Sequence, residues 1–238
     1  SNDHATMHPG IHLAFGDLGQ VDFWRNRGHV LHERFVRKPV GGPGAGRFTV
    51  RNRYVEGERT LCVETCRHEV LVRPGGVLLI YDSRFESDKS DFYFGDQEEM
   101  GLGVRVAREL RVQGGKGWIL DSQGRRNGKA VWGKTARWCA YGGVIGSHHV
   151  GLALMPHPQN FRPSWFHARD YGFLAANPFG RRAFTRGQPS RLVVKRGKTF
   201  RLRYGVLVYS VAAGKQPDLD AAFRDYVRLT DKTDKTRK

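Results

Sequence analysis

The feature that most constrains this chain is a series of long segments in which apolar and polar residues alternate. Residues 29–37, 46–56, 59–73 and 76–87 follow this pattern, and the clearest stretches read RFTVRNRYVE and TLCVETCRHEVLV. A period of two residues places one side of a strand against a core and leaves the other side to solvent. Glycine turns separate the segments, and Glu56-Gly57-Glu58 predicts a hairpin between the second and the third. The pattern therefore predicts an antiparallel β-sheet protein.

Weaker patterns predict further strands and one helix. The other strand candidates are residues 101–108, 136–142, 148–156, 171–176 and 199–210. Residues 113–129 are rich in Gly and Arg, and we expect an irregular excursion there. Residues 217–229 carry an apolar stripe at helical spacing that begins at Pro217. We predict one all-β domain over residues 1–230, a large antiparallel β-sandwich closed by this C-terminal helix, with residues 231–238 as a flexible tail.

Composition and charge narrow the class of protein. The chain has 238 residues, of which 39% are hydrophobic, and a net charge of +17. Its apolar runs are far shorter than the roughly 20 residues of a membrane-spanning helix, so we expect no membrane span. Lys and Arg are spread over nearly every segment, which indicates a solvated basic surface, and we do not expect nucleic acid as a partner. Binding to an anionic polymer is the alternative interpretation of the charge.

The three cysteines indicate thiols rather than a disulfide framework. Cys62 and Cys66 lie four residues apart in a strand-like run, so they would be roughly 13 Å apart at about 3.3 Å per residue, too far for a disulfide. One bridge to Cys139 is the most that the count allows, and an odd, low count fits free thiols in a reducing compartment. We expect a soluble, cytoplasmic protein. A secreted or periplasmic location is the alternative if a signal segment preceded residue 1.

One segment, WFHARDYGFLAANPFG from Trp165 to Gly180, gathers polar and aromatic side chains between glycines and a proline. Such a mixture is typical of a pocket rather than of a strand interior. His167 and Arg169 would share one face of an extended chain. Upstream, His157 lies between two prolines that fix its backbone. Two fixed imidazoles suit acid/base chemistry or hydroxyl recognition, and a buried structural role is the alternative for each.

A second segment, FGDQEEMGLGVRV, places carboxylates before a strand. Asp96, Glu98 and Glu99 stand close together, and Arg105 follows them. Paired carboxylates serve as acids and bases in sugar chemistry, and a nearby arginine can hold one of them ionised. Adjacent carboxylates are also common on solvated loops, which is the alternative interpretation.

A third segment begins DHATMHPGIHLAFGDLGQ and repeats histidine every four residues, at His4, His8 and His12. On a helix these would share a face, as for a metal site, but Pro9-Gly10 argues against a helix. In an extended chain they would be about 13 Å apart, too far to share one ion. The chain also contains no nucleophile elbow, Walker loop, CxxC pair or zinc-helix motif.

The motifs together resemble a known family. The matching stretches keep their order along the chain: HPGIHLAFGDLGQVDFW, FGDQEEMGLGVRVA, MPHPQNFRPSWFHARDYGFLAANPFG and RYGVLVY. The chain resembles the bacterial PmoA-related family, which is often labelled methane oxygenase PmoA, although Met7-His8 stands where many members have two adjacent histidines. A membrane monooxygenase subunit would need several apolar spans of about 20 residues, which this chain lacks. The resemblance implies instead a galactose mutarotase-like β-sandwich and a part in carbohydrate metabolism.

We therefore expect a carbohydrate-active protein that binds a sugar or an oxidised sugar in a cleft of the sandwich. The protein would catalyse acid/base chemistry on this sugar, such as epimerisation, elimination or hydrolysis. The predicted catalytic residues are His157, His167 and Glu99. The predicted substrate-binding residues are His8, Arg169, Asn177, Trp165, Asp96 and Arg105. We expect no cofactor and no metal; the alternatives are a non-catalytic module for anionic polymers such as acidic glycans, and a metal enzyme that uses His8, His157 and His167.

Overall fold

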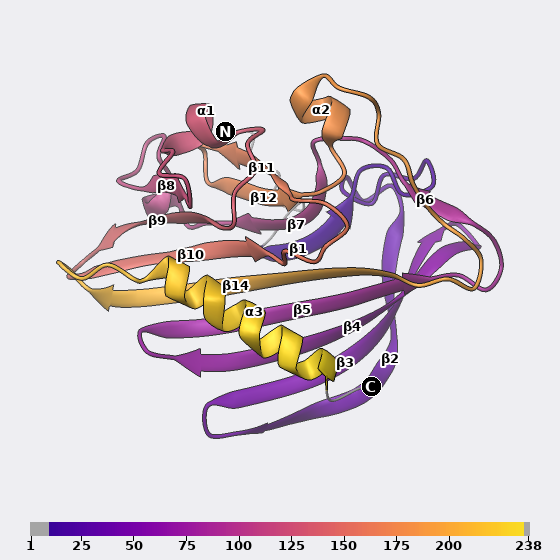
Figure 1. The fold of residues 1–238 in the computed structure, drawn as a ribbon, viewed down its shortest axis with the longest axis horizontal. Helices are drawn as coiled ribbons and strands as arrows, with labels where there is room; N and C mark the ends of the chain where they lie inside the picture. Colours follow the sequence, from indigo (N-terminus) through magenta and orange to yellow (C-terminus); the bar gives the residue numbers. More distant parts are fainter. Residues whose placement is uncertain (1–9, 236–238) are drawn as a thin grey trace.

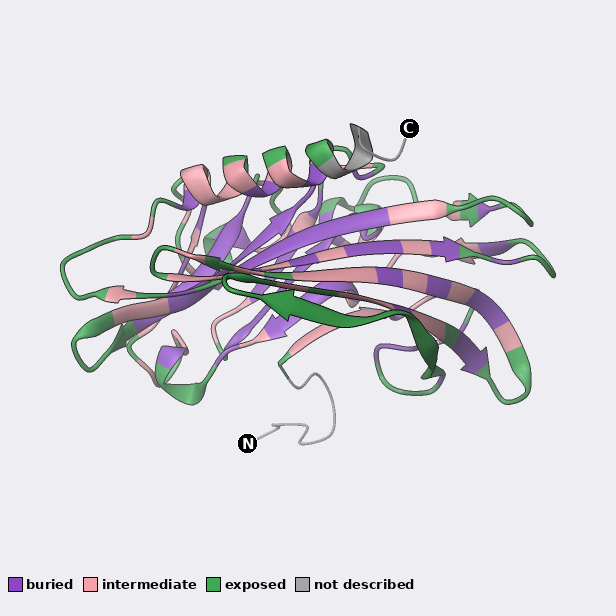
Figure 2. Ribbon diagram, turned by 90° about the horizontal axis from the view of Figure 1, so that it is seen from below, coloured by how far each residue is buried: buried purple, intermediate pink, exposed green. Residues whose placement is uncertain are grey.

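A computed structural model describes residues 10–235 of the 238-residue chain. These residues form three layers: an eight-stranded sheet in the middle, a four-stranded sheet over one of its faces, and the helix α3 (Leu219–Lys235) over the other. Figure 1 looks onto the side that carries α3, and Figure 2 shows the layers from the edge, with α3 outermost on one side.

The eight-stranded sheet is antiparallel and begins with four strands joined by short turns. Its order is β2 (His29–Gly42), β3 (Ala45–Glu56), β4 (Arg59–Arg73), β5 (Gly76–Glu86), β14 (Phe200–Ala212), β10 (His148–Pro156), β9 (Cys139–Ile145) and β8 (Trp118–Asp121). Gly57 closes the β3–β4 hairpin with a φ of 55°, which glycine adopts without steric cost. β2 is a free edge whose residues are all exposed, and irregularities interrupt its pairing with β3, as is common at sheet edges.

The four-stranded sheet joins segments that are far apart in the chain. Its order is β1 (Ile11–Phe15), β7 (Met100–Arg105), β12 (Phe173–Asn177) and β11 (Trp165–Arg169). β6 (Phe92–Phe94) pairs with β13 (Leu192–Val194) in a separate small sheet. The connections contain a 3-10 turn η1 (Arg108–Leu110) and two short helices, α1 (Asn127–Val131) and α2 (Arg181–Thr185).

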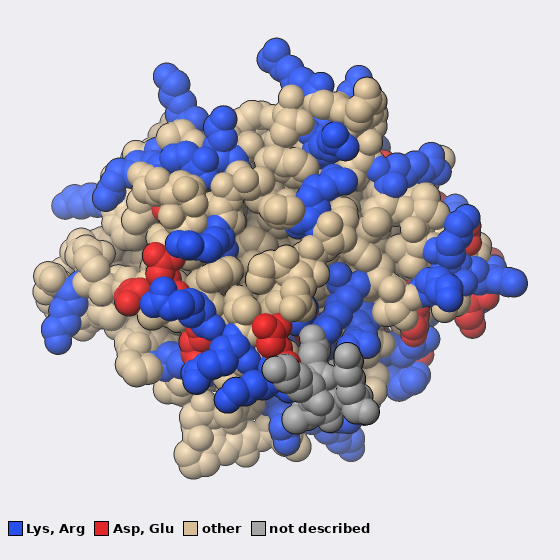
Figure 3. Space-filling view, in the orientation of Figure 1, with Lys and Arg blue, Asp and Glu red and all other residues tan. Residues whose placement is uncertain are grey.

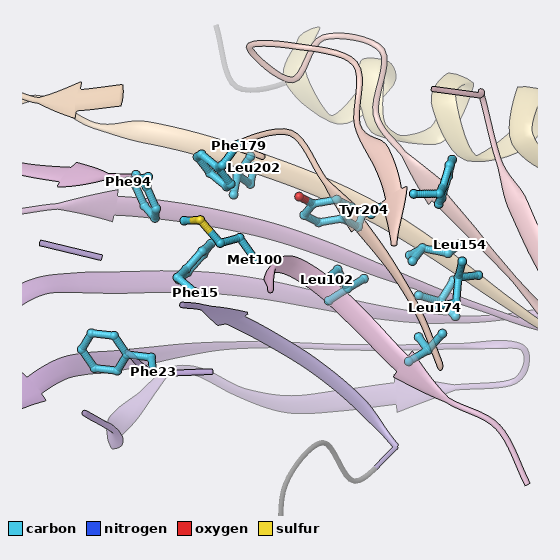
Figure 4. Packing of buried hydrophobic residues seen from close by; sticks show 14 of the residues in the cluster. Phe15, Phe23, Phe94, Met100, Leu102, Leu154, Leu174, Phe179, Leu202 and Tyr204 are labelled. Atoms are coloured by element: carbon cyan, nitrogen blue, oxygen red, sulfur yellow. The ribbon is translucent and has the colours of Figure 1, made fainter. Parts of the chain in front are cut away.

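The main core lies between the two large sheets. Phe15 of β1 packs edge-on against Phe94 of β6 at 4.8 Å between ring centroids, and Phe94 stacks on Phe179 at 4.9 Å. All three rings are fully buried, and Figure 4 shows them with Leu202 and Tyr204 of the facing strand β14. Complete burial of a phenylalanine side chain contributes about 1.5–3 kcal/mol relative to an exposed one. This aromatic cluster therefore fixes the four-stranded sheet on the eight-stranded sheet.

α3 covers the opposite face of the eight-stranded sheet with an apolar stripe. Tyr226 is fully buried, and its ring lies so close to Gly205 of β14 that a Cβ there would be 2.9 Å from the ring. Leu219 at the start of the helix packs into the same cluster, with Ile80 and Leu207 of the sheet. The close approach of the helix thus requires glycine at position 205.

The predicted all-β class, with large antiparallel sheets and a C-terminal helix, is confirmed. The helix runs from Leu219 to Lys235, so residues 231–235, which the sequence assigns to a tail, are helical. The sequence pattern does not predict β8, which is a four-residue strand inside the excursion expected over 113–129. It also does not predict β11, because the strand carries the mixed polar side chains of a pocket. Within the part of the chain that the structure describes, no helix is both long and apolar enough to cross a membrane.

The three cysteines are buried free thiols, as the sequence indicated. Burial raises the pKa of the Cys62, Cys66 and Cys139 thiols well above the ordinary value. A thiol in such surroundings stays protonated and behaves as a small apolar side chain.

Candidate functional site

The four-stranded sheet turns one face to the core and the other away from the eight-stranded sheet. Leu102, Val104 and Leu174 belong to the core between the sheets. The alternate residues point to the opposite side, which we call the outer face. The outer face consists of His12 and Ala14 of β1, Gly101, Gly103 and Arg105 of β7, Phe173, Ala175 and Asn177 of β12, and Trp165, His167 and Arg169 of β11.

Strand register places two histidines in one row across the outer face. His12 pairs with Gly103, Gly103 with Ala175, and Ala175 with His167. Directly paired residues of antiparallel strands point to the same side, so an imidazole stands at each end of the row. Gly103 has no side chain, and a Cβ there would be 2.5 Å from Nε2 of His12 and 3.3 Å from the Trp24 ring. The glycine therefore leaves the space that these two rings occupy.

Phe173 forms the centre of the outer face. Its ring centroid lies 5.2 Å from the His167 ring, 6.3 Å from the His12 ring and 5.7 Å from the Trp24 ring. Phe173 and Trp24 are only 3% and 4% exposed. The two imidazoles therefore flank a largely buried aromatic floor.

Arg169 connects His167 to a carboxylate. Its Nε donates a hydrogen bond to Nε2 of His167 at 2.9 Å, and its Nη2 donates to Oε2 of Glu98 at 2.9 Å. The same carboxylate oxygen lies 3.6 Å from Nε2 of His167. An imidazole nitrogen that accepts from a guanidinium carries no proton, so His167 is held as a neutral ring. His167 is almost fully buried, whereas the Arg169 side chain is 40% exposed and reaches the rim.

Glu99, the neighbour of Glu98, joins the rim through Arg25. Nη2 of Arg25 lies 3.2 Å from Oε1 of Glu99, and its Nη1 lies 2.9 Å from Oδ2 of Asp22. The hydrogen bond to Asp22, with the charges of both carboxylates, raises the pKa of Arg25. Arg25 follows Trp24 directly, so this ion-pair cluster borders the aromatic floor.

Arg105 lies in the row next to the histidines. Its guanidinium is 5.5 Å from the centroid of Phe173, its cross-strand partner, and 5.4 Å from that of Tyr171. Within residues 10–235, the side chain of Arg105 makes no ion pair or hydrogen bond with another residue. Its position is set by the aromatic rings, and its N–H donors stay available.

Trp165 lies on the same strand as His167 and two residues before it. Its ring stacks toward Phe184 of α2 at 6.3 Å, and the Arg162 guanidinium lies 5.7 Å from its centroid. The indole is partly exposed at the edge of the outer face. It extends the aromatic surface toward α2.

His157 lies in another layer of the molecule. It follows the last residue of β10 and is 2% exposed, next to α3. Its Nε2 is 2.9 Å from Oγ1 of Thr230, and its Nδ1 accepts the N–H of Gln159 at 3.1 Å. The structure therefore does not bring His157 to His167, and we leave it outside the candidate site.

Asp96 and Asn177 hold backbone segments beside the site. The Asp96 carboxylate accepts the N–H groups of Arg182, Ala183 and Ser190. Asn177 is fully buried and binds four backbone groups, those of Gln97, Glu98, Phe179 and Gly180. These contacts position the loop that carries Glu98. Both side chains therefore hold the backbone around the site and are not available to bind a ligand.

Sequence reasoning left His12, Glu98 and Phe173 out of the set of site residues. The regular histidine spacing contains a signal for His12, and Glu98 adjoins Glu99, but nothing marks Phe173 before the strand register is known. His8, a predicted contact, lies outside the described residues. Among residues 10–235, no group of three or more His, Cys, Asp or Glu side chains is placed to hold a metal ion.

The chain belongs to a family whose members share one sequence pattern over nearly its full length. Residues 2–224 match the family described as DUF6807, a family of unknown function. No curated protein sequence matches the chain. None of these comparisons supports the resemblance to PmoA-related proteins that the motifs suggested.

Three solved structures are similar to the chain at low identity. One is a galactose mutarotase-like protein from Lactobacillus casei ATCC 334, with 12% identity, a TM-score of 0.41, and coverage of 84% of this chain and 83% of that chain. Another is the alpha-galactosidase from Lactobacillus brevis, with 8% identity, a TM-score of 0.36, and coverage of 79% and 27%. A galactose mutarotase related enzyme from Lactobacillus acidophilus has 11% identity, a TM-score of 0.33, and coverage of 87% and 77%.

Proposed function

We propose that the outer face binds an oxidised sugar, a monosaccharide that carries a carboxylate. The observation that carries this proposal is the state of Arg105. Its guanidinium packs on Tyr171 and Phe173, and its side chain has no carboxylate partner within the described part of the chain. A guanidinium held by aromatic rings presents a planar pair of N–H donors that matches a carboxylate.

The surroundings of Arg105 suit the rest of a sugar. Tyr171, which is 44% exposed beside Arg105, and the partly exposed indole of Trp165 supply apolar surface for the C–H groups of a pyranose ring. Near these rings, Glu98, Glu99 and Arg25 supply acceptors and donors for hydroxyl groups, and each is partly exposed. Small-molecule sites usually combine an apolar surface with a few polar groups around it.

We assign acid/base chemistry to His167. Arg169 donates to its Nε2, so the ring is neutral and can accept a proton once Arg169 turns to a ligand carboxylate. The base would remove the proton from the carbon beside the carboxylate. The C–H electron pair then moves into the carboxylate group, and an N–H bond forms on His167. This is the first step of epimerisation or elimination at that carbon.

Titration calorimetry tests the binding proposal. D-galacturonate and D-glucuronate should bind more tightly than galactose and glucose. Arg105→Gln should weaken uronate binding about tenfold or more, because a hydrogen bond to a charged group contributes about 1.5–3 kcal/mol. Arg47→Gln is the matched control, since Arg47 is exposed on β3 in the other sheet. Equal affinity of wild type and Arg105→Gln would contradict the proposal.

Deuterium exchange tests the acid/base assignment separately. In D₂O, the wild-type protein should introduce deuterium at C5 of a uronate that it binds, and His167→Gln should not. Binding without exchange by the wild-type protein would remove the catalytic step and leave a binding protein.

A second candidate function, binding of an anionic polymer, has one specific observation in its favour. Arg84 and Arg201 are direct cross-strand partners on β5 and β14, and like charges in that position repel each other. Arg201 pairs with Asp82 at 2.6 Å, whereas Arg84 has no ion pair in the described chain. Figure 3 shows the Lys and Arg side chains scattered over this side of the molecule rather than gathered in one block. Heparin binding that falls steeply with salt and is weakened by Arg84→Gln would support this function.

A further inference from the structure

A hollow lies between the edge strand β8 and the beginning of α3. Its volume is about 540 Å³, within the range of about 300–1,000 Å³ that is typical of small-molecule sites. Its lining comes from β8, the loop after it, Trp138 just before β9 and the segment that leads into α3. This hollow shares no residue with the outer face.

One wall of the hollow consists of apolar rings. Trp118 is paired across the strands with Gly142, and a Cβ on that glycine would be 3.3 Å from the indole. The absence of a side chain opposite lets the indole lie close along the sheet, where it remains partly exposed. Trp138 is buried, and its Nε1 donates to Oδ1 of Asp220 at 2.8 Å. The Asp220 contact fixes the second indole against the start of α3.

The other wall supplies polar groups that the protein does not use internally. The side chains of Gln216 and Arg126 make no hydrogen bond with another residue in the described chain. Asp218 uses Oδ1 to accept the N–H of Ala221 at 2.8 Å, and its other oxygen accepts no hydrogen bond within residues 10–235. An amide, a guanidinium and a carboxylate together offer both donors and acceptors, which neighbouring sugar hydroxyls require.

The charges around the hollow nearly balance. The carboxylates of Asp218 and Asp220 stand against Arg126, which lines the hollow, Arg137, which pairs with Asp220 at 2.9 Å, and Arg224, whose charge also acts on Asp220. This balance contrasts with the net charge of +17 of the whole chain. A nearly neutral local surface gives little advantage to a charged ligand, whereas an indole face with donors and acceptors favours an uncharged ring that has one apolar side.

We infer that this hollow is a binding site for a neutral pyranose, which would stack on Trp118 and bind its hydroxyls to Gln216, Arg126 and Asp218. The site is independent of the function proposed for the outer face. It would let the protein hold an uncharged sugar unit, such as one residue of a longer glycan, at a distance from the uronate site.

Saturation-transfer NMR with methyl β-D-glucopyranoside and cellobiose tests the inference on the full chain. Both probes should give transfer signals, and Trp118→Ala should weaken binding about tenfold or more, because stacking and apolar burial on one indole are lost. Gln216→Ala should weaken it several-fold, since a donor and an acceptor are lost. The matched control is Gln113→Ala, which changes an exposed glutamine away from the hollow.

Gln216→Ala keeps the test decisive if Trp118→Ala does not fold, because the Gln216 side chain bonds to nothing else in the described structure. Arg105→Gln should leave the signals of the neutral probes unchanged, which separates this site from the outer face. Absence of transfer signals for both probes at tens of millimolar would overturn the inference. So would signals that Gln216→Ala and a folded Trp118→Ala leave unchanged.

Discussion

His12 and His167 stand at opposite edges of the four-stranded sheet in one cross-strand row, with only Gly103 and Ala175 between them. The two small residues leave the middle of the row without a bulky side chain. The ring of Phe173, from the adjacent row, lies between the two imidazoles. The arrangement provides two fixed imidazoles over one aromatic floor, with Arg169 and Arg105 beside them, and it is the basis of the function we propose.

Gly103→Ala should damage the site while leaving the fold intact. The new Cβ would lie 2.5 Å from Nε2 of His12 and 3.3 Å from the Trp24 ring, so both rings must move. We expect uronate affinity to fall several-fold in titration calorimetry. Gly46→Ala is the matched control, because the nearest atom to its Cβ is 3.8 Å away. Unchanged affinity in Gly103→Ala would show that the position of His12 does not matter for binding.

Asn177→Ala should destabilise the protein by about 3 kcal/mol. The substitution leaves several backbone groups, which the amide now binds, buried without a partner, and each such group costs about 1–3 kcal/mol. Urea unfolding followed by circular dichroism measures the loss. Gln113→Ala, in an exposed loop, should stay within about 0.5 kcal/mol of wild type. A loss of binding without a loss of stability would instead place Asn177 in contact with the ligand.

His68 should make the protein sensitive to acid. Burial lowers the pKa of His68 to about 4, and its ring stacks on Phe48 at 4.6 Å between centroids. The unfolded chain binds a proton near pH 6.5 but the folded protein does not, so this group costs stability as pH falls from about 6.5 toward 4. His68→Phe keeps the stacked ring and removes the titration.

The measurement is the melting temperature of both proteins at about pH 7 and about pH 4.5. The decrease on acidification should be smaller in His68→Phe. Burial raises the pKa of Glu64, on the same sheet face, so acidification makes this residue less unfavourable for the folded state. This effect on stability is opposite to that of His68. It is present in both proteins and therefore cancels in the comparison. An identical decrease in the two proteins would contradict the burial of a neutral imidazole.

Tyr209→Phe should stabilise the protein by about 1 kcal/mol. The Tyr209 hydroxyl is buried and finds no hydrogen-bond partner among the described residues, so its removal ends a desolvation cost. Tyr141→Phe is the matched comparison, because that hydroxyl accepts the N–H of Val112 at 3.1 Å and donates to the carbonyl of Asp170 at 2.9 Å. Chemical denaturation should move the two variants in opposite directions. A loss of stability in Tyr209→Phe equal to that in Tyr141→Phe would contradict this account.

Local sequence pattern was sufficient for the strands β2 to β5 and for the β3–β4 hairpin, because alternation and glycine turns act between neighbours in the chain. The outer face is different, because β1 (Ile11–Phe15), β7 (Met100–Arg105) and β12 (Phe173–Asn177) come from distant parts of the chain. The motifs pointed to segments that the fold brings together, since His167, Arg169 and Arg105 share this face. They could not show that Asn177 and Asp96 bind backbone groups, or that His157 lies under α3, because these contacts depend on the register and layer of each strand.

The central claim is that the outer face is one binding site, and histidine-ring NMR tests it most directly. In protein labelled with ¹⁵N at histidine, His12 and His167 are assigned by the loss of signals in His12→Gln and His167→Gln. On titration with D-galacturonate, both rings should shift with one dissociation constant, and the ring of His157 should not move. The account would be contradicted if only the His157 ring shifted. It would also be contradicted if His12 and His167 did not shift at ligand concentrations that calorimetry shows to saturate the protein.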